Sequence, residues 1–220
     1  MTDRKLRWGI VSTGRIAHTL AHAIGQSTSG ELVAVGSRAQ DSAAAFAREF
    51  DVPRAHGSYE ALFADPDVDV VYIATPHPSH AHWSVLAARA RKHILCEKPL
   101  GMTCAEAERI VSAARENDVF LMEAFMYRCA PQTQKLVELV QSGVLGRVHV
   151  IQASFGFDGA FPLSGRMLSN ELGGGGIMDV GCYPVSIARL VAGAATGAPF
   201  RDPLSLQGVG HVGEHSQVDE

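Results

Sequence analysis

The stretch Lys92-His93-Ile94-Leu95-Cys96-Glu97-Lys98-Pro99 joins a short apolar segment to an acid, a base and a proline. A helix start follows at once, because Thr103-Cys104-Ala105-Glu106 fits the capping box, with Thr103 as N-cap. The stretch therefore predicts a buried strand, a charged turn at its carboxyl end, and then a helix. Taken alone, the Glu-Lys pair is equally well explained as a solvated ion pair in a surface turn.

The same strand-then-helix unit recurs through the first half of the chain. Apolar segments that predict strands lie at residues 6–11, 31–36, 68–73 and 119–122. Ile16, Leu20 and Ile24 follow the first segment at four-residue spacing, the stripe of a helix that packs on a sheet. Alternating strands and helices imply right-handed crossovers and a parallel sheet, and continuous apolar strands are typical of a sheet covered on both faces. We expect a doubly wound α/β domain of the Rossmann type over residues 1–122.

Residues 123–220 show a different pattern. Helices are predicted at 131–142 and from about 177 to 191, and strands at 147–155 and 203–212. Two strands make a poor sheet, because three or more, or a packed helix, are normally needed. We therefore expect an α+β domain over residues 123–220 that is incomplete as given.

Composition excludes several classes of function. The formal net charge is -4 and the charges are scattered, which argues against a nucleic-acid surface and a polybasic membrane face. We find no signal peptide and no apolar run long enough to cross a bilayer. The four cysteines show no C-x-x-C spacing, which is typical of reduced thiols in a cytoplasmic protein.

Unusual polar residues gather where the predicted strands end. In open parallel sheets, ligands bind at the carboxyl ends of the strands, so these residues should surround one crevice. In chain order they are Ser12, Thr13, Gly14, Arg15 and Ile16; Ser37 and Arg38; Thr75, Pro76, His77 and His80; Glu97 and Lys98; and Glu123. We interpret all but Glu123 as candidate cofactor-binding residues.

The first two strand ends predict the kind of nucleotide. Ser12-x-Gly14-x-x-Ala17 departs from G-x-G-x-x-G, yet Gly14 lets the backbone approach a pyrophosphate, and the helix N-terminus supplies N–H groups. An NAD site carries an acid after the second strand, whereas the hydroxyl and guanidinium of Ser37 and Arg38 suit a 2′-phosphate. NADP is thus favoured over NAD. A tight turn and a solvated arginine are the alternatives.

Three histidines at positions 77, 80 and 82 raise the alternative of a metal site. However, Pro76 and Pro78 keep the segment partly extended, and no cysteine or carboxylate is adjacent. We expect no metal here and place the segment beside the nicotinamide ribose.

Several motifs in order carry a family resemblance. They are Gly9-Ile10-Val11-Ser12-Thr13-Gly14-Arg15-Ile16-Ala17, Ala74-Thr75-Pro76, Cys96-Glu97-Lys98-Pro99-Leu100, Glu123-Ala124-Phe125-Met126-Tyr127-Arg128 and Gly174-Gly175-Gly176-Ile177-Met178-Asp179-Val180-Gly181-Cys182-Tyr183-Pro184. Together they resemble the glucose-fructose oxidoreductase/inositol dehydrogenase (Gfo/Idh/MocA) family. Many members have His at the position of Tyr183. In having Tyr there, the sequence resembles the branch of the family that contains dihydrodiol dehydrogenases and NADP-dependent sugar dehydrogenases.

The resemblance implies catalytic roles for Lys98, Asp179 and Tyr183, which would meet the nicotinamide and the substrate carbinol. Tyr183 would be the acid/base, and since a free phenol has a pKa near ~10, the Lys98 ammonium would help by favouring the phenolate. Asp179 would bind the substrate hydroxyl or orient Lys98, and its four-residue spacing from Tyr183 puts both on one helix face. A core aromatic and a helix cap are the alternatives for Tyr183 and Asp179. The resemblance also implies a cis Lys98–Pro99 bond.

The resulting expectation is a cytoplasmic NADP-dependent dehydrogenase that acts on a hydroxyl of a sugar, polyol or cyclic diol, or on the matching carbonyl. Arg128, Arg166 and Asn170 are candidate substrate residues. The resemblance implies that residues 123–220 are part of a domain with an open sheet that serves substrate binding and oligomerisation. Family members normally continue well beyond this point, so we expect a C-terminally truncated chain, and the homo-oligomer that the family implies becomes doubtful. The alternatives are a non-catalytic NADP-binding sensor or partner protein, and an inactive remnant.

Overall fold

The computed structural model describes residues 4–157 and 165–219. The chain divides into two compact units, residues 1–124 and 125–220, and each unit is described by itself.

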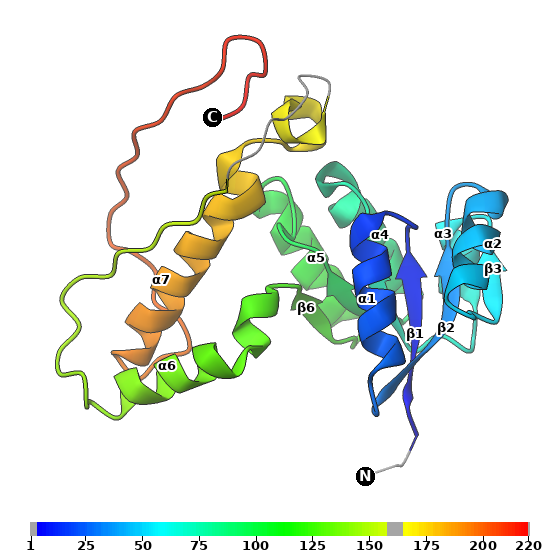
Figure 1. The fold of residues 1–220 in the computed structure, drawn as a ribbon, viewed down its shortest axis with the longest axis horizontal. Coiled ribbons are helices and arrows are strands. Elements are labelled where there is room, and N and C mark those ends of the chain that lie inside the picture. The colour runs from blue at the N-terminus through cyan, green and yellow to red at the C-terminus, as the bar shows by residue number, and fades with distance from the viewer. Residues whose placement is uncertain (1–3, 158–164, 220) are drawn as a thin grey trace. The chain divides into compact units, whose positions relative to one another are not determined.

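The first unit is built on a six-stranded parallel sheet with strand order β3-β2-β1-β4-β5-β6. Figure 1 labels strands β1, β2 and β3 and the helices α1 and α2 of this unit. The strands are β1 (Leu6–Val11), β2 (Gly30–Gly36), β3 (Arg54–His56), β4 (Val70–Ile73), β5 (His93–Cys96) and β6 (Leu121–Glu123). The helices are α1 (Arg15–Gly25), α2 (Gln40–Glu49), α3 (Tyr59–Ala64), α4 (His80–Arg89) and α5 (Cys104–Glu116). The predicted doubly wound α/β sheet is confirmed.

The continuous apolar strands are explained by two separate cores. Ile10 packs in a cluster with residues of α1 and α2, whereas its neighbour Val11 packs in a cluster with residues of α3, α4 and α5. Both side chains are fully buried. Since successive side chains of a strand point to opposite faces, helices on both faces demand apolar residues at every position.

Two local predictions in this unit were incomplete or wrong. The short β3 and α3 were not predicted. With three and six residues, they are too short to show a clear periodic pattern of apolar residues in the sequence. In α1 the buried residues are Ala17, Ala21 and Ile24, whereas Ile16 is 44% exposed. Each four-residue step turns a 3.6-residue helix by about 40°, so a stripe of two such steps drifts off the packed face.

The second unit contains helices α6 (Pro131–Gln141) and α7 (Cys182–Ala194), both close to the predicted bounds. A π-helical turn, Ile177–Gly181, leads into α7, and short 3-10 turns lie at Met126–Cys129, Arg166–Leu168 and Asn170–Leu172.

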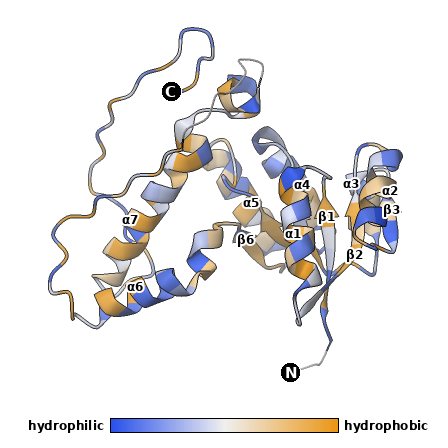
Figure 2. Cartoon of the chain, in the orientation of Figure 1, coloured by the Kyte–Doolittle hydropathy of each residue, from blue (hydrophilic) through white to orange (hydrophobic). Residues whose placement is uncertain are grey.

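The two strands predicted in the second unit were wrong. Residues 147–155 and 203–211 are extended but belong to no strand, and the β contact described in residues 125–157 and 165–219 is one isolated bridge between Val212 and Asp219. The backbone of residues 147–155 is coloured in alternating hydrophobic and hydrophilic stretches in Figure 2, yet alternation forms a strand only where a neighbouring strand accepts its backbone hydrogen bonds. Val150 is accordingly 82% exposed and Val209 fully exposed.

The expectation that no apolar run could span a bilayer also needs correction. The helical stretch Asn170–Ala194 is long and apolar enough for that by length and composition alone. It is interrupted by Gly173–Gly176 and by a change of helix type, and it carries Asp179. We therefore assign it to the fold of the second unit.

Candidate functional site

The strand register brings the predicted strand ends of the first unit to one edge of the sheet. Val11 pairs with Gly36 on one side and with Ile73 on the other, Ile73 pairs with Cys96, and Cys96 pairs with Glu123. These five residues form one row across the sheet. The polar residues that follow each of them therefore emerge side by side, as the sequence predicted.

The turn after β1 has the features of a phosphate-binding turn. Gly14 is the N-cap of α1 and no side chain caps that helix, which also has no acid in its first turn. Its first N–H groups and positive dipole are thus directed at whatever lies beyond the strand end. Ser12 has φ 102°, a backbone conformation that side chains disfavour, and its hydroxyl accepts a hydrogen bond from the Gly14 N–H at 3.2 Å. Thr13, Arg15 and Ile16 are partly or fully exposed around this turn.

The end of β2 presents the hydroxyl and guanidinium that the sequence predicted. Ser37 is buried and Arg38 is exposed. Tyr59, the first residue of α3, is buried in the neighbourhood of Arg38 and Ser12. Burial raises the pKa of the Tyr59 phenol, and the nearby Arg38 charge only partly opposes that shift. Sequence reasoning missed Tyr59; the N-cap Ser58 beside it was the available signal.

The end of β4 holds a polar group that lacks a partner. The Thr75 hydroxyl is buried, yet it makes no hydrogen bond within the described part of the chain. A buried hydroxyl without a partner costs about 1–3 kcal/mol, so a ligand group that bonds to it would bind with a local advantage. Pro76 is exposed beside it.

His80 joins the ends of β4 and β5. The ring is fully buried, with Nδ1 2.7 Å from the Pro99 carbonyl oxygen and Nε2 2.8 Å from the Thr75 carbonyl oxygen. Both nitrogens face backbone acceptors, which fits a support for the crevice better than a metal ligand. His77 is buried against it, with ring centroids 5.6 Å apart, and His82 is exposed.

The charged turn after β5 is held by hydrogen bonds from three directions. The buried Tyr72 hydroxyl donates to the Glu97 carboxylate, which also accepts from the Lys98 N–H at 3.2 Å. The Glu123 carboxylate accepts from the Leu100 N–H at 2.7 Å. Lys98 itself is half-buried. The Lys98–Pro99 peptide bond is cis, as the resemblance implied.

The predicted helix cap beyond this turn is confirmed with one change. Thr103 Oγ1 accepts from the Glu106 N–H at 3.2 Å, and α5 begins at Cys104. The Glu106 carboxylate reaches back to the Met102 N–H at 2.8 Å, one residue before the N-cap itself. The two bonds fix the exit of the chain from the charged turn.

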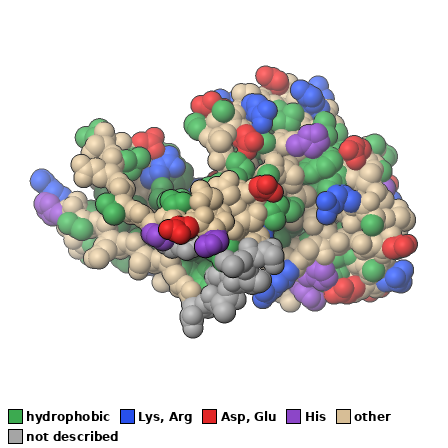
Figure 3. All heavy atoms as spheres, turned by 90° about the horizontal axis from the view of Figure 1, so that it is seen from above, with side chains coloured by type: hydrophobic (Ala, Val, Ile, Leu, Met, Phe, Trp, Pro, Cys, Tyr) green, Lys and Arg blue, Asp and Glu red, His purple; other side chains and the backbone are tan. Residues whose placement is uncertain are grey.

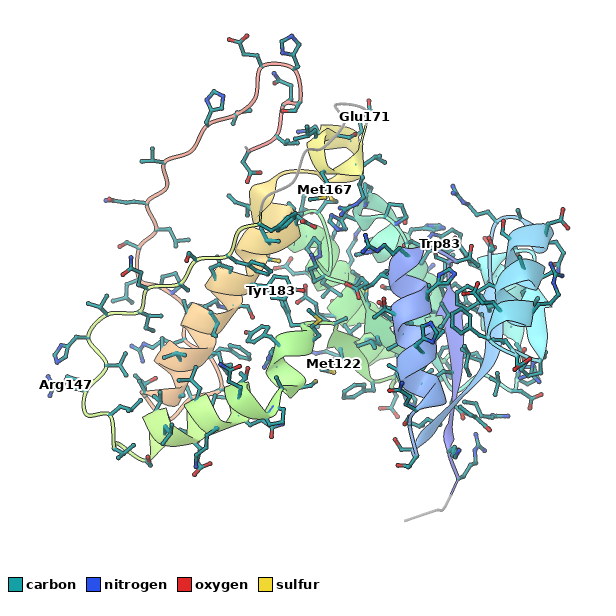
Figure 4. The ribbon with its side chains drawn as sticks, viewed as in Figure 1. Trp83, Met122, Arg147, Met167, Glu171 and Tyr183 are labelled. Carbon is teal, nitrogen blue, oxygen red and sulfur yellow. The ribbon has the colours of Figure 1, made fainter. Side chains whose placement is uncertain are left out.

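In the second unit, Asp179 and Tyr183 lie on consecutive turns of the π-helical segment and α7. Asp179 pairs with Arg166, at 3.4 Å between a carboxylate oxygen and a guanidinium nitrogen. Tyr183 projects from α7 (Figure 4), and its ring meets Phe125 and Phe155 edge-on, each at 5.4 Å between centroids. It lines a groove of about 900 Å3 between α6 and α7. Of the three candidate substrate residues, the structure thus brings Arg166 to Asp179.

The other two candidate substrate residues are engaged elsewhere. The Arg128 guanidinium lies 4.4 Å from the centroid of the Phe200 ring, a cation–π contact. The Asn170 amide donates to the Gln217 carbonyl oxygen at 2.7 Å. Both contacts hold the C-terminal segment to the helical part of the second unit.

Charged side chains of both signs share one face of the molecule. On the face seen in Figure 3, acidic, basic and histidine side chains are interspersed. Among the described residues no group of three or more His, Cys, Asp or Glu is arranged to hold a metal ion.

Residues 6–125 match the model of the Gfo/Idh/MocA oxidoreductase family with an NAD-binding Rossmann fold, and residues 133–210 match the Gfo/Idh/MocA C-terminal domain. Trans-1,2-dihydrobenzene-1,2-diol dehydrogenase of Mus musculus is 40% identical over 95% of this chain and 61% of its own length. An NADP(+)-dependent D-xylose 1-dehydrogenase of Haloferax volcanii is 41% identical over 86% of this chain and 58% of its own length.

A solved structure gives the same result. A 3-ketoreductase from Actinomadura kijaniata, in complex with NADP and TDP-benzene, is 32% identical with a TM-score of 0.73, over 86% of this chain and 58% of its own. The chain spans about three-fifths of the length of these relatives. The two family matches together cover most of the chain, and on that basis it belongs to the Gfo/Idh/MocA family of oxidoreductases.

Proposed function

We propose that this chain carries the cofactor site and acid-base residues of an NADP-dependent oxidoreductase that oxidises a hydroxyl of a sugar or cyclic diol, or reduces the matching carbonyl. The observation that carries the proposal is the row of strand ends, with an uncapped helix N-terminus at Gly14 and an unpartnered hydroxyl at Thr75. The named activities of the dihydrodiol and xylose dehydrogenases support it.

The residues present fit a phosphorylated dinucleotide. The α1 N-terminus would hold the pyrophosphate, because its N–H groups lack a side-chain cap. Arg38 and Ser37 would bind the 2′-phosphate, and Thr75 would donate to the ribose or nicotinamide portion. NADP, when bound, supplies the hydride acceptor or donor at its nicotinamide ring.

Lys98, Tyr183 and Asp179 would supply the proton chemistry. Tyr183 takes the proton of the substrate hydroxyl during oxidation and returns it during reduction. The Lys98 ammonium lowers the cost of the phenolate, and Asp179, paired with Arg166, binds the substrate hydroxyl. Solved structures of the 3-ketoreductase include one variant with a tyrosine changed to phenylalanine and one with a lysine changed to alanine, both with NADP and TDP-benzene.

A cytoplasmic location is proposed with the function, supported by four cysteines that are all free thiols. The substrates would be small molecules, and the homo-oligomer that family membership implies is a further expectation.

The test has two stages. First, NADPH and NADH are titrated into the purified chain, with binding read from nicotinamide fluorescence. Second, NADP reduction is screened with aldoses, inositols and dihydrodiols, using this chain beside a longer version that spans the full length of its relatives. Lys98→Met and Tyr183→Phe should each lower kcat by a factor of about 10²–10⁴ and leave the Kd for NADPH nearly unchanged.

Lys5→Met serves as the matched control, since it removes an exposed lysine that lies outside the crevice. Normal turnover in either catalytic variant would refute the acid-base assignment. Tight NADPH binding without turnover of any substrate by either version would favour a non-catalytic NADP-binding protein.

A further inference from the structure

Asp219 caps the start of the helical stretch that carries Asp179 and Tyr183. Its Oδ2 accepts a hydrogen bond from the Ile177 N–H at 2.6 Å, and its backbone carbonyl oxygen accepts from the Gly176 N–H at 3.0 Å. Gly176 occupies the N-cap position and has no side chain that could cap the helix. Asp219 therefore does the work of an N-cap residue, although it lies 42 residues beyond Ile177.

Three glycines leave the space that this contact needs. A Cβ on Gly175, which has φ 102°, would collide with Asp219 Oδ1, and one on Gly176 would lie 3.3 Å from Asp219 Oδ2. A Cβ on Gly174 would lie 2.5 Å from the Met167 carbonyl oxygen. The glycines therefore let both the carboxylate and the backbone that precedes the turn approach the helix start closely.

The segment that presents Asp219 is itself held in place. Val212 and Asp219 form an antiparallel bridge, and Val218 between them in sequence is only 6% exposed. The Asn170 amide donates to the Gln217 carbonyl oxygen at 2.7 Å. Since the carboxylate comes from a folded segment, it loses little conformational entropy when it caps the helix.

The cap leaves the Asp179 carboxylate free of a capping role. Asp179 lies in the first turn of the helical stretch, where a carboxylate commonly interacts with the unpaired N–H groups of a helix start. Here the Ile177 N–H already has the Asp219 carboxylate as its acceptor, and Asp179 pairs with Arg166. The Asp179 N–H donates to the Gly175 carbonyl oxygen at 3.1 Å, so the capped turn also sets the position of Asp179.

From these contacts we propose that Asp219 is a positioning residue for Asp179 and Tyr183. Its carboxylate holds the glycine-rich turn and the π-helical segment in one arrangement, on which both side chains depend because they lie on consecutive turns. The inference rests on the proposed function, in which Asp179 and Tyr183 act on the substrate. It adds a residue outside the motifs that predicted them.

The composition of the turn explains why a single carboxylate has this effect. Glycine adopts many backbone conformations, so three in succession do not define the start of a helix by themselves. A hydrogen bond from a backbone N–H to a carboxylate is stronger than one to a neutral acceptor. Without the Asp219 carboxylate, the Ile177 N–H loses its acceptor, and the glycines and Asp179 can take other arrangements.

Hydrogen exchange of the 220-residue chain tests the position of the helix without any substrate. The exchange rates of backbone amides 176–183 are measured by NMR in the wild type, Asp219→Ala and Asp219→Asn. Asp219→Ala should raise the exchange rate of the Ile177 amide by at least about 10-fold, as expected for the loss of a hydrogen bond to a charged group. Asp219→Asn should stay within about 3-fold of the wild type, because asparagine caps helices about as well as aspartate.

Glu214→Ala is the matched control, since it removes an exposed carboxylate from the same segment. It should change the exchange rate of the Ile177 amide by less than about 2-fold. The amides of α6, in the same unit, should keep their wild-type rates in every variant. Faster exchange of α6 in Asp219→Ala would show that the whole unit unfolds, and would overturn the proposal.

Turnover tests the consequence for the proposed reaction. With the substrate that the screen identifies, Asp219→Ala should lower kcat by at least about 10-fold, because small displacements of catalytic groups are costly. The Kd for NADPH should stay within about 2-fold, since the proposed cofactor residues belong to the first unit. Asp219→Asn should recover most of kcat, and Glu214→Ala should keep the wild-type value.

Wild-type exchange of the Ile177 amide in Asp219→Ala would overturn the proposal, and so would faster exchange with an unchanged kcat. Asp219→Asn with the same losses as Asp219→Ala would refute the role of the acceptor oxygen. If no wild-type version of the chain turns over a substrate, the proposed function fails instead, while the exchange rates still decide whether Asp219 holds the helix start.

Discussion

Both units of the molecule contain apolar segments with strand-like sequences, but only the first unit buries them. In β1 and β4 the residues Ile10, Val11, Val71 and Ile73 are fully buried, because each strand has hydrogen-bonded neighbours and helices on both faces. In the second unit Leu204 and Leu206 are 98% and 85% exposed in an extended segment without a strand partner in the described range 165–219. An apolar pattern therefore indicates which side chains a strand could bury. Whether they are buried depends on neighbouring strands and covering helices.

Charged groups differ between the units in the same way. Asp69 of the first unit accepts hydrogen bonds from the Arg7 side chain and N–H and from Arg4, at 2.6–3.0 Å, with a side chain only 20% exposed. The Arg189–Asp202 pair of the second unit has a similar separation, 2.7 Å, but Asp202 is 79% exposed. Solvent screening leaves such exposed pairs with little net stabilisation.

Thiol reactivity should show the largest difference between the units. Burial raises the pKa of Cys96, at the end of β5, to about 12, whereas Cys129 of the second unit is exposed. Since the thiolate is the reactive form, Cys96 should react with iodoacetamide at pH 8 at least about 10³-fold more slowly. Mass spectrometry of timed samples measures both rates, and unfolding in guanidinium chloride should make them similar. Fast labelling of native Cys96 would contradict its burial.

Leucine-to-alanine substitutions should show the next largest difference between the units, in their effect on the free energy of unfolding. Leu62→Ala removes a fully buried side chain between α3 and the sheet and should lower the free energy of unfolding by about 3 kcal/mol. Leu206→Ala removes an exposed side chain of the same size and should change it by less than about 0.5 kcal/mol. Urea titrations followed by circular dichroism measure both. Similar losses would mean that residues 203–211 are buried in solution.

Acid should weaken the first unit through Asp69. Hydrogen bonds from Arg7 hold the pKa of Asp69 well below its usual range, so its contribution is present above the unfolded pKa near ~4 and is lost as the pH falls. Asp69→Asn should cost about 1–2 kcal/mol of unfolding free energy at pH 7, a cost that shrinks toward pH 2. Asp202→Asn is the control and should cost less than about 0.5 kcal/mol at either pH. A pH-independent cost for Asp69→Asn would show a packing effect instead.

The smallest effects are expected at two backbone positions with positive φ. Ser12 has φ 102° without being glycine, whereas the second unit has a glycine at its φ 74° position, Gly197. Ser12→Gly should raise the free energy of unfolding by at most about 0.5 kcal/mol, because relief of strain is offset by chain entropy and the lost hydroxyl contact. Gly197→Ser should lower it by about 1 kcal/mol. Thermal melts of the two variants and the wild type show whether each substitution stabilises or destabilises the protein. A destabilising Ser12→Gly would mean that the hydrogen bond between the Ser12 hydroxyl and the Gly14 N–H outweighs the backbone strain.

Much of the first unit could be predicted from the sequence because its local patterns agree with its global fold. Apolar runs, Thr103 as a helix cap and the polar strand ends all proved correct, and the register explains why the strand ends meet. The packed face of α1 could not be predicted, since small alanines rather than the larger Ile16 lie against the sheet.

The failures in the second unit have a different origin. Residues 147–155 and 203–212 have strand-like sequences, but no sequence pattern states whether a partner strand is available. Tyr72 was missed for a related reason: its hydroxyl donates to the carboxylate of Glu97, which lies 25 residues further along the chain, and sequence spacing gives no sign of such a contact.

The π-helical turn at Ile177–Gly181 has a consequence for how this region can change by insertion and deletion. Such a turn holds about one residue more than an α-helical turn, so it amounts to a one-residue insertion within the helix. Loss of any single residue from this turn would make it an ordinary α-helical turn that continues into α7. The preceding glycines would then be rotated about the helix axis by about 100° relative to Tyr183. Point substitutions can adjust this segment gradually, but a change of its length by one residue re-orients every side chain before it.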